Sequence, residues 1–455
     1  MNSNDKGPAP NEVTACEPAA KPLVPVSVFY IMAIAMLSVG TSSVSFCSNQ
    51  VLPLTLRKFT DSTALIGFVV ALQALNQLWV TPYAAWKSDR IWTRIGRRRP
   101  LVLIITPLLA VTIMLVPHCP SLLLIIPWVF ILQMAEDADQ AVLMPSICDS
   151  VPDKQRPLAT AMWQVAVGIS VFLMGRYVMK LMDPGLHNVT LRFVGWLDLH
   201  KLGIRLPHIP VMGAEHWPYT ISGIAVLVTG VIFLFVMRER YVPPRPQDRF
   251  RLFTYGKEVL RIREHKLIYI VFFFQPLFYL VAIAYFPLLG RDVMHLKPSE
   301  YGAAYAWGAA TTLLTSIPLG WLFNRFRHRR AFCIGACAYV ILPITFGLFF
   351  MHTARDMAIF FCAQILAFNV FRLNFMPYVM EYTTHKNVGT ILGFTTAVNG
   401  LVRFTLVPLA GLLVDIFGRN YKLPLYGGYL GAVVCIIALL MMRPPSQAME
   451  GMADG

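Results

Sequence analysis

The sequence predicts an all-α membrane protein, with twelve transmembrane helices in two pseudo-symmetric six-helix halves. Three observations predict this class: the composition, the number of long apolar stretches and an internal repeat. Of the 455 residues, 56% are hydrophobic and only 14% are charged, whereas soluble domains carry about 25% charged residues. With a mean hydropathy of +0.58, a soluble chain of this length would expose large apolar patches. A lipid bilayer is therefore the expected environment.

Twelve apolar stretches are long enough to cross a bilayer, which takes about 20 residues of helix. In the first half of the chain they lie near residues 26–50, 62–86, 100–118, 121–148, 157–182 and 217–238. In the second half they lie near residues 266–290, 299–323, 330–352, 356–380, 388–417 and 423–442. The polar segment 1–24 is expected to be a disordered tail, and residues 443–455 a second tail.

The two halves look like diverged copies of each other. The segment LMPSICDSVPDK (143–154) matches FMPYVMEYTTHK (375–386) at an offset of 232 residues. The predicted organisation is an N-terminal six-helix half (25–238), a central loop (239–265) and a C-terminal six-helix half (266–442). Repeated six-helix halves are typical of transporters whose substrate site lies between the halves, near the middle of the bilayer.

Basic residues are concentrated in alternate loops. The loop 87–99 carries six basic residues and one acid, and the loop 324–330 carries four arginines and no acid. Because loops rich in Lys and Arg stay in the cytoplasm, we expect both termini there and the protein in the plasma (inner) membrane.

Nothing in the sequence suggests an enzyme. The eight cysteines are scattered without a CxxC pair, and the phosphate-binding pattern ending GK[ST] is absent. We therefore expect no enzymatic activity, no metal and no organic cofactor. The net charge of +15 is accounted for by the cytoplasmic loops, so we expect no nucleic-acid partner. We expect the protein to be a monomer in the lipid bilayer.

Three acids, Glu136, Asp137 and Asp139, lie inside the fourth apolar stretch, where charge is costly and usually functional. Gln133, Asp137 and Gln140 share one helical face, whereas Glu136 and Asp139 are expected to form a second pair on a neighbouring face. Asp137 lies about 18 Å from the nearer helix end at 1.5 Å per residue, close to the midplane. A carboxyl group in so apolar a place resists ionisation, so these acids could take up and release protons.

The second half offers bases at similar depth. Through the repeat, Asp137 aligns with Asn369 and Gln140 with Arg372, so acids in one half would face a base in the other. Arg403 is also deep within its stretch. The second stretch contains no acid that would help to bind sodium. Protons are therefore the expected coupling ion, and sodium is the alternative.

Polar and aromatic side chains inside several stretches predict a wet central cavity. Ligand sites of this kind combine aromatic surfaces with a few hydrogen-bonding groups. The candidate side chains are Gln73, Asn76, Gln133, Gln140, Trp163, Gln164, Gln275, Tyr279, Asn369 and Asn399. Each of them could instead join neighbouring helices by a hydrogen bond.

The loop KSDRIWTRIGRRRP (87–100) is similar to the loop between spans 2 and 3 of the major facilitator superfamily. Its long spacing and its GRRRP ending look closest to the glycoside–pentoside–hexuronide:cation symporters, and among them to the sucrose-transporter branch. The resemblance implies the major facilitator fold and the symport of a glycoside or small sugar with a cation. Met144 stands where sucrose-type members carry an arginine, so the resemblance does not extend to sucrose itself.

In that superfamily such loops form a cytoplasmic latch, which breaks and re-forms as the halves rock. Asp89 lies within the arginines, where it can pair with them and with a helix N-terminus. Asp149 and Glu381 end spans 4 and 10 and would receive the loop arginines of their own half. The latch residues implied are Asp89, Arg90, Arg94, Gly96, Arg97, Arg98, Arg99, Asp149, Arg325 and Glu381. The alternative is a loop that only sets the orientation.

Together these features predict a proton-coupled secondary transporter of a glycoside or small sugar that works by alternating access. The proton-coupling and substrate residues are predicted to be Asp137, Asp139, Glu136, Arg372 and Arg403. An exporter of drugs or organic anions is the first alternative. The second is a transporter-like sensor that moves no solute. The deep charges disfavour the sensor, because a scaffold has no need of them.

Overall fold

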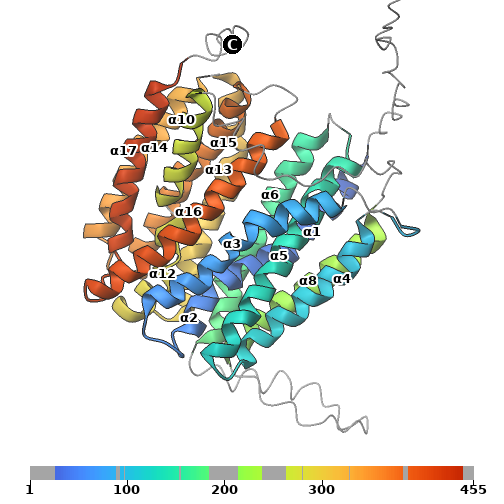
Figure 1. Ribbon diagram of the computed structural model, residues 1–455, viewed down its shortest axis with the longest axis horizontal. Coiled ribbons are helices and arrows are strands. Elements are labelled where there is room, and N and C mark those ends of the chain that lie inside the picture. The colour runs from blue at the N-terminus through green and yellow to red at the C-terminus, as the bar shows by residue number, and fades with distance from the viewer. Residues whose placement is uncertain are drawn as a thin grey trace, which may run out of the picture.

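The computed structural model describes residues 26–88, 93–96, 98–152, 155–183, 214–237, 263–278, 280–326, 328–382 and 388–443. Every regular element in these ranges is a helix, as Figure 1 shows. The expected tail 1–24, all but the first residue of the expected tail 443–455 and most of the expected central loop 239–265 lie outside the described residues.

Six helical rods form the first half of the bundle. The first rod runs without interruption from Val28 to Leu56, through α1 (Val28–Phe46), a π-helical turn (Cys47–Val51) and α2 (Leu52–Leu56). The others are α3 (Thr63–Ser88), α4 (Arg99–Leu115), α5 (Leu122–Ser150), α6 (Arg156–Leu173) with its continuation to Met182, and α8 (Trp217–Val236).

Six further rods form the second half, and their order repeats that of the first. The seventh rod begins with α10 (Arg263–Phe274) and continues through α11 (Leu280–Ile283) and α12 (Phe286–Leu288) to Val293. Its regular hydrogen bonding is interrupted near Pro276 and Pro287, since proline has no backbone N–H to donate. The remaining rods are α13 (Pro298–Arg325), α14 (Arg329–Phe349), α15 (Ala354–Met380), α16 (Val388–Ile416) and α17 (Tyr426–Met441).

The rods are membrane spans. Ten of the described helices are long and apolar enough to cross a bilayer. Two more, α5 and α13, are equally long and pack among them, although α5 contains acids and α13 is rich in small and polar residues. Large apolar side chains point outward from the bundle, among them Leu123, Phe235 and Leu314. The predicted all-α membrane protein with twelve transmembrane helices is confirmed.

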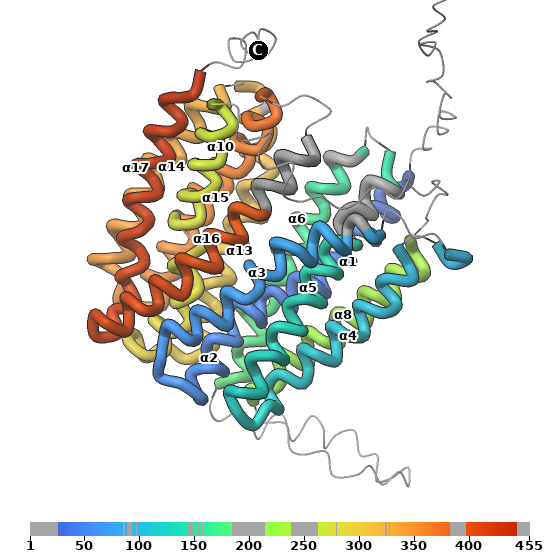
Figure 2. The backbone as a smooth tube through the Cα atoms, viewed as in Figure 1, coloured from blue at the N-terminus to red at the C-terminus, as the bar shows by residue number. Residues whose placement is uncertain are grey.

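The two halves meet along two pairs of helices, α3 with α16 and α6 with α13. Figure 2 shows α3 and α16 running side by side. Glycines allow the close approach. A Cβ on Gly400 would lie 2.7 Å from the carbonyl oxygen of Ala74, and a Cβ on Gly302 would lie 2.3 Å from that of Gly175. A side chain at either position would therefore push the halves apart.

Gly302→Ala should loosen the contact between α6 and α13, because the methyl group would collide with the backbone carbonyl oxygen of Gly175 as well as with the side chain of Met179. We expect a cysteine placed at Ser299, in a background without the native cysteines, to react several-fold faster with a membrane-impermeant maleimide. Gly320→Ala on the same helix is the matched control, since its Cβ would meet nothing within 4 Å. Equal labelling rates in the two variants would contradict this role of Gly302.

Candidate functional site

A cavity lies between the two halves. One part has a volume of about 530 Å³ and is bounded by α6 from the first half and by α13, α14 and α15 from the second. Its lining includes Thr160 and Gln164 on one side and Thr312, Ser316 and Asn369 on the other. It extends to Arg329 and Pro377, near the end of the bundle where α14 begins and α15 ends. We call this end, at which α1 also begins and α17 ends, the open end.

A second part of the cavity lies deeper in the bundle and has a volume of about 450 Å³. It borders the π-helical turn of the first rod with Asn49 and Gln50, and α5 with Gln140. Gln164 and Arg372 line both parts, so we treat them together as the central cavity. π-helical turns inside helices are often found at functional sites. This turn marks Asn49 and Gln50 as cavity residues in the structure, but their sequence gives no sign of it.

The charged side chains that line the central cavity are all arginines: Arg329, Arg372 and Arg403. Among the described lining residues there is no aspartate or glutamate. Arg329 is paired with Glu381 at 2.8 Å near the open end. The cavity therefore offers a solute positive charge together with uncharged hydrogen-bonding groups.

The three deep acids of α5, Glu136, Asp137 and Asp139, lie behind this surface and have different neighbours. Glu136 is fully buried and accepts hydrogen bonds from Ser45, from Ser48 at 3.2 Å and from Gln73 at 3.1 Å. These partners come from α1, the adjoining turn and α3, so Glu136 joins three helices of the first half.

Asp137 points toward the second half. It is 2% exposed, interacts with Gln77 of α3, and its Oδ2 has no hydrogen-bond partner. Arg403 of α16 lies close enough to interact electrostatically with both Asp137 and Glu136. An acid of one half and a base of the other thus interact beside the central cavity, but the base is Arg403 and not Arg372, which the repeat had placed opposite the acids.

Asp139 has a different neighbour. Its carboxylate accepts a hydrogen bond of 3.1 Å from Thr106 on α4 and is 2% exposed. It does not line the central cavity. Asp139 interacts electrostatically with Glu136, but the two carboxylates accept their hydrogen bonds from different helices, Asp139 from α4 and Glu136 from the first rod and α3.

The predicted cavity residues fall into two groups. Gln140, Trp163, Gln164 and Asn369 line the central cavity. The others lie elsewhere. Asn76 donates to the carbonyl of Phe130 at 3.3 Å, and Gln133 donates to the carbonyl of Val69. Gln73 donates to Glu136, and Gln275 and Asn399 are not among the lining residues. Tyr279 lies outside the described residues.

The reason is packing: α3 and α5 face each other, so their polar groups satisfy one another inside the half. This is the helix-joining alternative that the sequence left open.

The basic loop of the first half is described in part. Gly96 has a φ of +124°, a value that favours glycine, and it closes a tight turn with Thr93 through two backbone hydrogen bonds of 3.0 and 3.1 Å. Arg98 is 2% exposed and donates to the carbonyl of Val142 at 3.0 Å, while Arg99 donates to that of Met237. Arg94 is exposed. Asp89, Arg90, Arg97 and the side chain of Asp149 lie outside what the structure describes.

In the second half, Glu381 pairs with an arginine of its own half as expected, but this arginine is Arg329 and not Arg325. Arg329 pairs with Glu381 at 2.8 Å and also donates to the carbonyl of Pro377 at 3.1 Å. Arg325, the expected latch residue, lies over the ring of Trp321 at 5.9 Å. Arg325 ends α13, whereas Arg329 begins α14. The beginning of α14 lies beside the end of α15, which brings Arg329 to Glu381.

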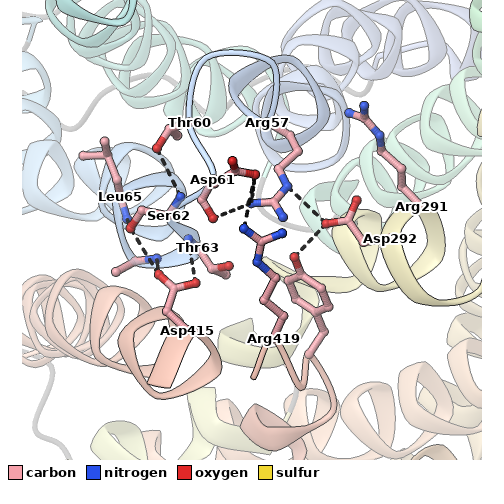
Figure 3. A network of polar contacts seen from close by, with 12 residues as sticks. Arg57, Thr60, Asp61, Ser62, Thr63, Leu65, Arg291, Asp292, Asp415 and Arg419 are labelled. Carbon is pink, nitrogen blue, oxygen red and sulfur yellow. Dashed lines mark hydrogen bonds and ion pairs between the residues drawn. The ribbon is translucent and has the colours of Figure 1, made fainter. Parts of the chain in front are cut away.

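A polar network joins the halves at the opposite end of the bundle, which we call the closed end (Figure 3). Arg57, after α2, pairs with Asp292 of the seventh rod at 3.1 Å. Tyr421, before α17, donates to the same carboxylate at 2.7 Å. Arg419 reaches back to Asp61 at 3.3 Å. None of these residues was predicted from the sequence to belong to a site.

Asp415 at the end of α16 caps the start of α3 across the same interface. Its two oxygens accept from the backbone N–H of Thr63 at 2.9 Å and of Ala64 at 3.0 Å, and Ser62 adds a hydroxyl at 3.1 Å. A carboxylate at a helix N-terminus satisfies otherwise unpaired donors and interacts favourably with the helix dipole. Figure 3 shows the cap beside the ion pairs.

Two groups at the closed end lie outside the spans and have shifted pKa values. Burial and the hydrogen bond to Asp292 raise the pKa of Tyr421 to about 12, so Tyr421 stays a neutral donor near neutral pH. Burial and the neighbouring Arg291 lower the pKa of Lys58, which pairs with Glu215. Acidification near neutral pH therefore leaves the charge of Tyr421 unchanged.

The fold and the cavity between repeated halves agree with a comparison to known families. The model of the Major Facilitator Superfamily matches residues 28–404 and 292–451, which together span nearly the whole chain. The chain belongs to the Major Facilitator Superfamily. It is thus a multi-pass membrane protein with the fold of a secondary transporter, and not an enzyme.

Solved structures of other transporters share this major facilitator fold. A bacterial homologue of the human lysosomal transporter Spinster, inward-facing and unoccupied, superposes with a TM-score of 0.66 at 14% identity, over 90% of this chain and 94% of that one. The nucleoside transporter NupG gives 0.66 at 11% identity, over 91% and 100%. A POT family transporter bound to a thioalcohol-conjugated peptide gives 0.65 at 10% identity, over 90% and 95%. Comparison with curated protein sequences gives no significant match. At such identities the likeness concerns the fold alone.

Proposed function

We propose that this major facilitator protein is a proton-coupled symporter of a small hydroxylated solute, a glycoside or sugar. The observation that carries the proposal is the electrostatic interaction between Asp137 and Arg403. A nearly fully buried carboxyl oxygen without a partner lies beside a guanidinium from the other half. Buried charges are costly unless they are paired or used, and a proton is the smallest group that can satisfy such an oxygen.

Proton binding at Asp137 would be coupled to movement through Arg403. When Asp137 is ionised, it attracts Arg403 and holds α5 near α16. When it is protonated, the attraction is lost, and Arg403 is available to the solute in the central cavity, which it lines. A ligand shifts a two-state equilibrium only by its different affinity for the two states, and this pair provides such a difference for the proton.

The lining of the central cavity supports a hydroxyl-bearing solute. Gln164, Thr312, Ser316 and Asn369 offer donors and acceptors, and the 9%-exposed ring of Trp163 lies at its wall. The volumes of about 530 and 450 Å³ fall within the usual range for small-molecule sites, about 300–1,000 Å³.

The basic loops at the open end give the proposed orientation. Loops rich in Lys and Arg stay in the cytoplasm, so we place both termini and the open end there. In this orientation the structure corresponds to a state open to the cytoplasm, with the network of Arg57 and Asp292 closing the outer side.

The test is uptake by purified protein in liposomes with an acidic outside and a neutral inside. The panel contains labelled methyl glucoside, sucrose, glucuronate and glucose 6-phosphate. We expect at least one of them to accumulate above its outside concentration, and accumulation to stop when an ionophore removes the pH gradient. Uptake that ignores the gradient would overturn proton coupling, and movement of none of the four would remove the sugar class and favour the sensor alternative.

A further inference from the structure

Arg372 is a second deep arginine, and it differs from Arg403 because none of the described acids interacts with it. It lies on α15, its side chain is exposed to the central cavity, and it lines both parts of that cavity. Among the described residues it makes no hydrogen bond and no ion pair. The nearest candidates for pairing, Glu136 and Asp137, interact with Arg403.

An unpaired guanidinium inside a membrane protein is costly, and such groups normally pair with an acid or face water and mark a solute path. The deep acids Glu136, Asp137 and Asp139 do not line the central cavity and are 2% exposed or less. The charge on the cavity surface is therefore unbalanced until a solute enters. A neutral solute would leave Arg372 unpaired in any state in which water is excluded.

We propose that the transported solute carries an anionic group, a carboxylate or a phosphate, and that Arg372 binds this group. The planar guanidinium can donate two parallel hydrogen bonds to either anion. The proposal rests on the proposed function, sugar or glycoside symport, and narrows it to sugar acids or sugar phosphates. Asn369 and Ser316, which line the cavity with Arg372, are positioned to contact the hydroxyls of the same molecule.

The net charge moved in each transport cycle distinguishes an anionic substrate from a neutral one. One proton moving with a monoanion carries no net charge across the membrane. One proton moving with a neutral glucoside carries one positive charge, and one proton with a doubly charged sugar phosphate carries one negative charge. The response of uptake to an imposed membrane potential therefore distinguishes the three.

The experiment measures uptake of labelled glucuronate, methyl glucoside and glucose 6-phosphate into proteoliposomes, with the membrane potential set by valinomycin and potassium. We expect glucuronate or glucose 6-phosphate to be preferred over methyl glucoside. Glucuronate uptake should be unchanged by the potential, and glucose 6-phosphate uptake should fall when the inside is made negative. Whichever of glucuronate and glucose 6-phosphate is taken up faster identifies the anionic group as a carboxylate or a phosphate.

Arg372→Gln should raise the KM for the preferred anion by about 30-fold or more, as for removal of one partner of a buried charge pair. Arg372→Lys should recover part of this loss, because the charge returns without the second hydrogen bond. Arg176→Gln is the matched control: Arg176 is an exposed membrane arginine that lines none of the described cavities, and its KM should equal that of the wild type. Size-exclusion profiles establish that each variant is folded.

The outcomes separate the two proposals. If methyl glucoside accumulates with the pH gradient and the anions do not, the anionic substrate is overturned while proton-coupled sugar symport stands. The anionic substrate is also overturned if Arg372→Gln transports an anion with unchanged KM. If neither these three solutes nor sucrose moves in wild-type protein, both proposals fail.

Discussion

Asp137→Asn should abolish accumulation of the substrate against its gradient. Asparagine has nearly the same shape but cannot release a proton, so the site would stay locked in its uncharged form. With one proton per substrate, a difference of about two pH units supports up to roughly 100-fold accumulation, because each unit corresponds to 1.36 kcal/mol. We expect the variant to reach only equal concentrations inside and outside, measured as labelled solute retained in proteoliposomes.

Asp139→Asn is the matched control for this substitution. Asp139 is an equally buried acid two residues away on α5, but it accepts from Thr106 on α4, whereas Arg403 interacts with Asp137 and Glu136. We expect it to keep accumulation within about twofold of wild type, since an asparagine can still accept that hydrogen bond. Loss of accumulation in Asp139→Asn with retention in Asp137→Asn would move the proton site to Asp139 and contradict the assignment.

Arg57→Ala should shift the protein toward a state in which the closed end is open. The side chain of Arg57 is only 6% exposed and that of Asp292 only 21%, so the substitution leaves a half-buried carboxylate with one donor fewer. Breaking a buried pair costs about 3–5 kcal/mol, and about 5.5 kcal/mol reverses a two-state population from 1:99 to 99:1. Spin labels at Tyr177 and Val293, exposed positions in opposite halves, should report a longer distance.

Arg419→Ala tests whether this effect depends on burial. Arg419 joins the same network, but its partner Asp61 is 83% exposed, and such exposed pairs contribute about 0–1 kcal/mol. We expect a distance distribution close to that of wild type. An equal shift in both variants, or none in Arg57→Ala, would show that the network of Arg57 and Asp292 does not hold the end closed.

The span pattern and the deep charges could be predicted because each depends on local sequence. Twelve stretches of apolar residues suffice to place twelve helices, and Asp137 and Arg403 stand out because few charges occur inside spans. Helical periodicity also placed Gln140 on the face that lines the central cavity. These features need no knowledge of how the helices pack.

Features that depend on packing could not be predicted. Asp415 caps Thr63 across 352 residues of chain, and nothing near either residue indicates the other. The polar groups Gln73, Asn76 and Gln133 resemble cavity residues by composition, yet they bond within the first half because α3 and α5 face each other. A span's polar face can meet water or another helix, and hydropathy does not distinguish the two.

Substrate-driven proton movement is the most direct test of proton-coupled transport. A pH-sensitive dye is trapped inside proteoliposomes without an imposed gradient, and the preferred solute of the uptake panel is added outside. We expect the inside to acidify with about one proton per molecule taken up in wild type, and no acidification in Asp137→Asn. Entry of the solute into wild-type vesicles with no change in internal pH would contradict the coupling of Asp137 and Arg403 to transport.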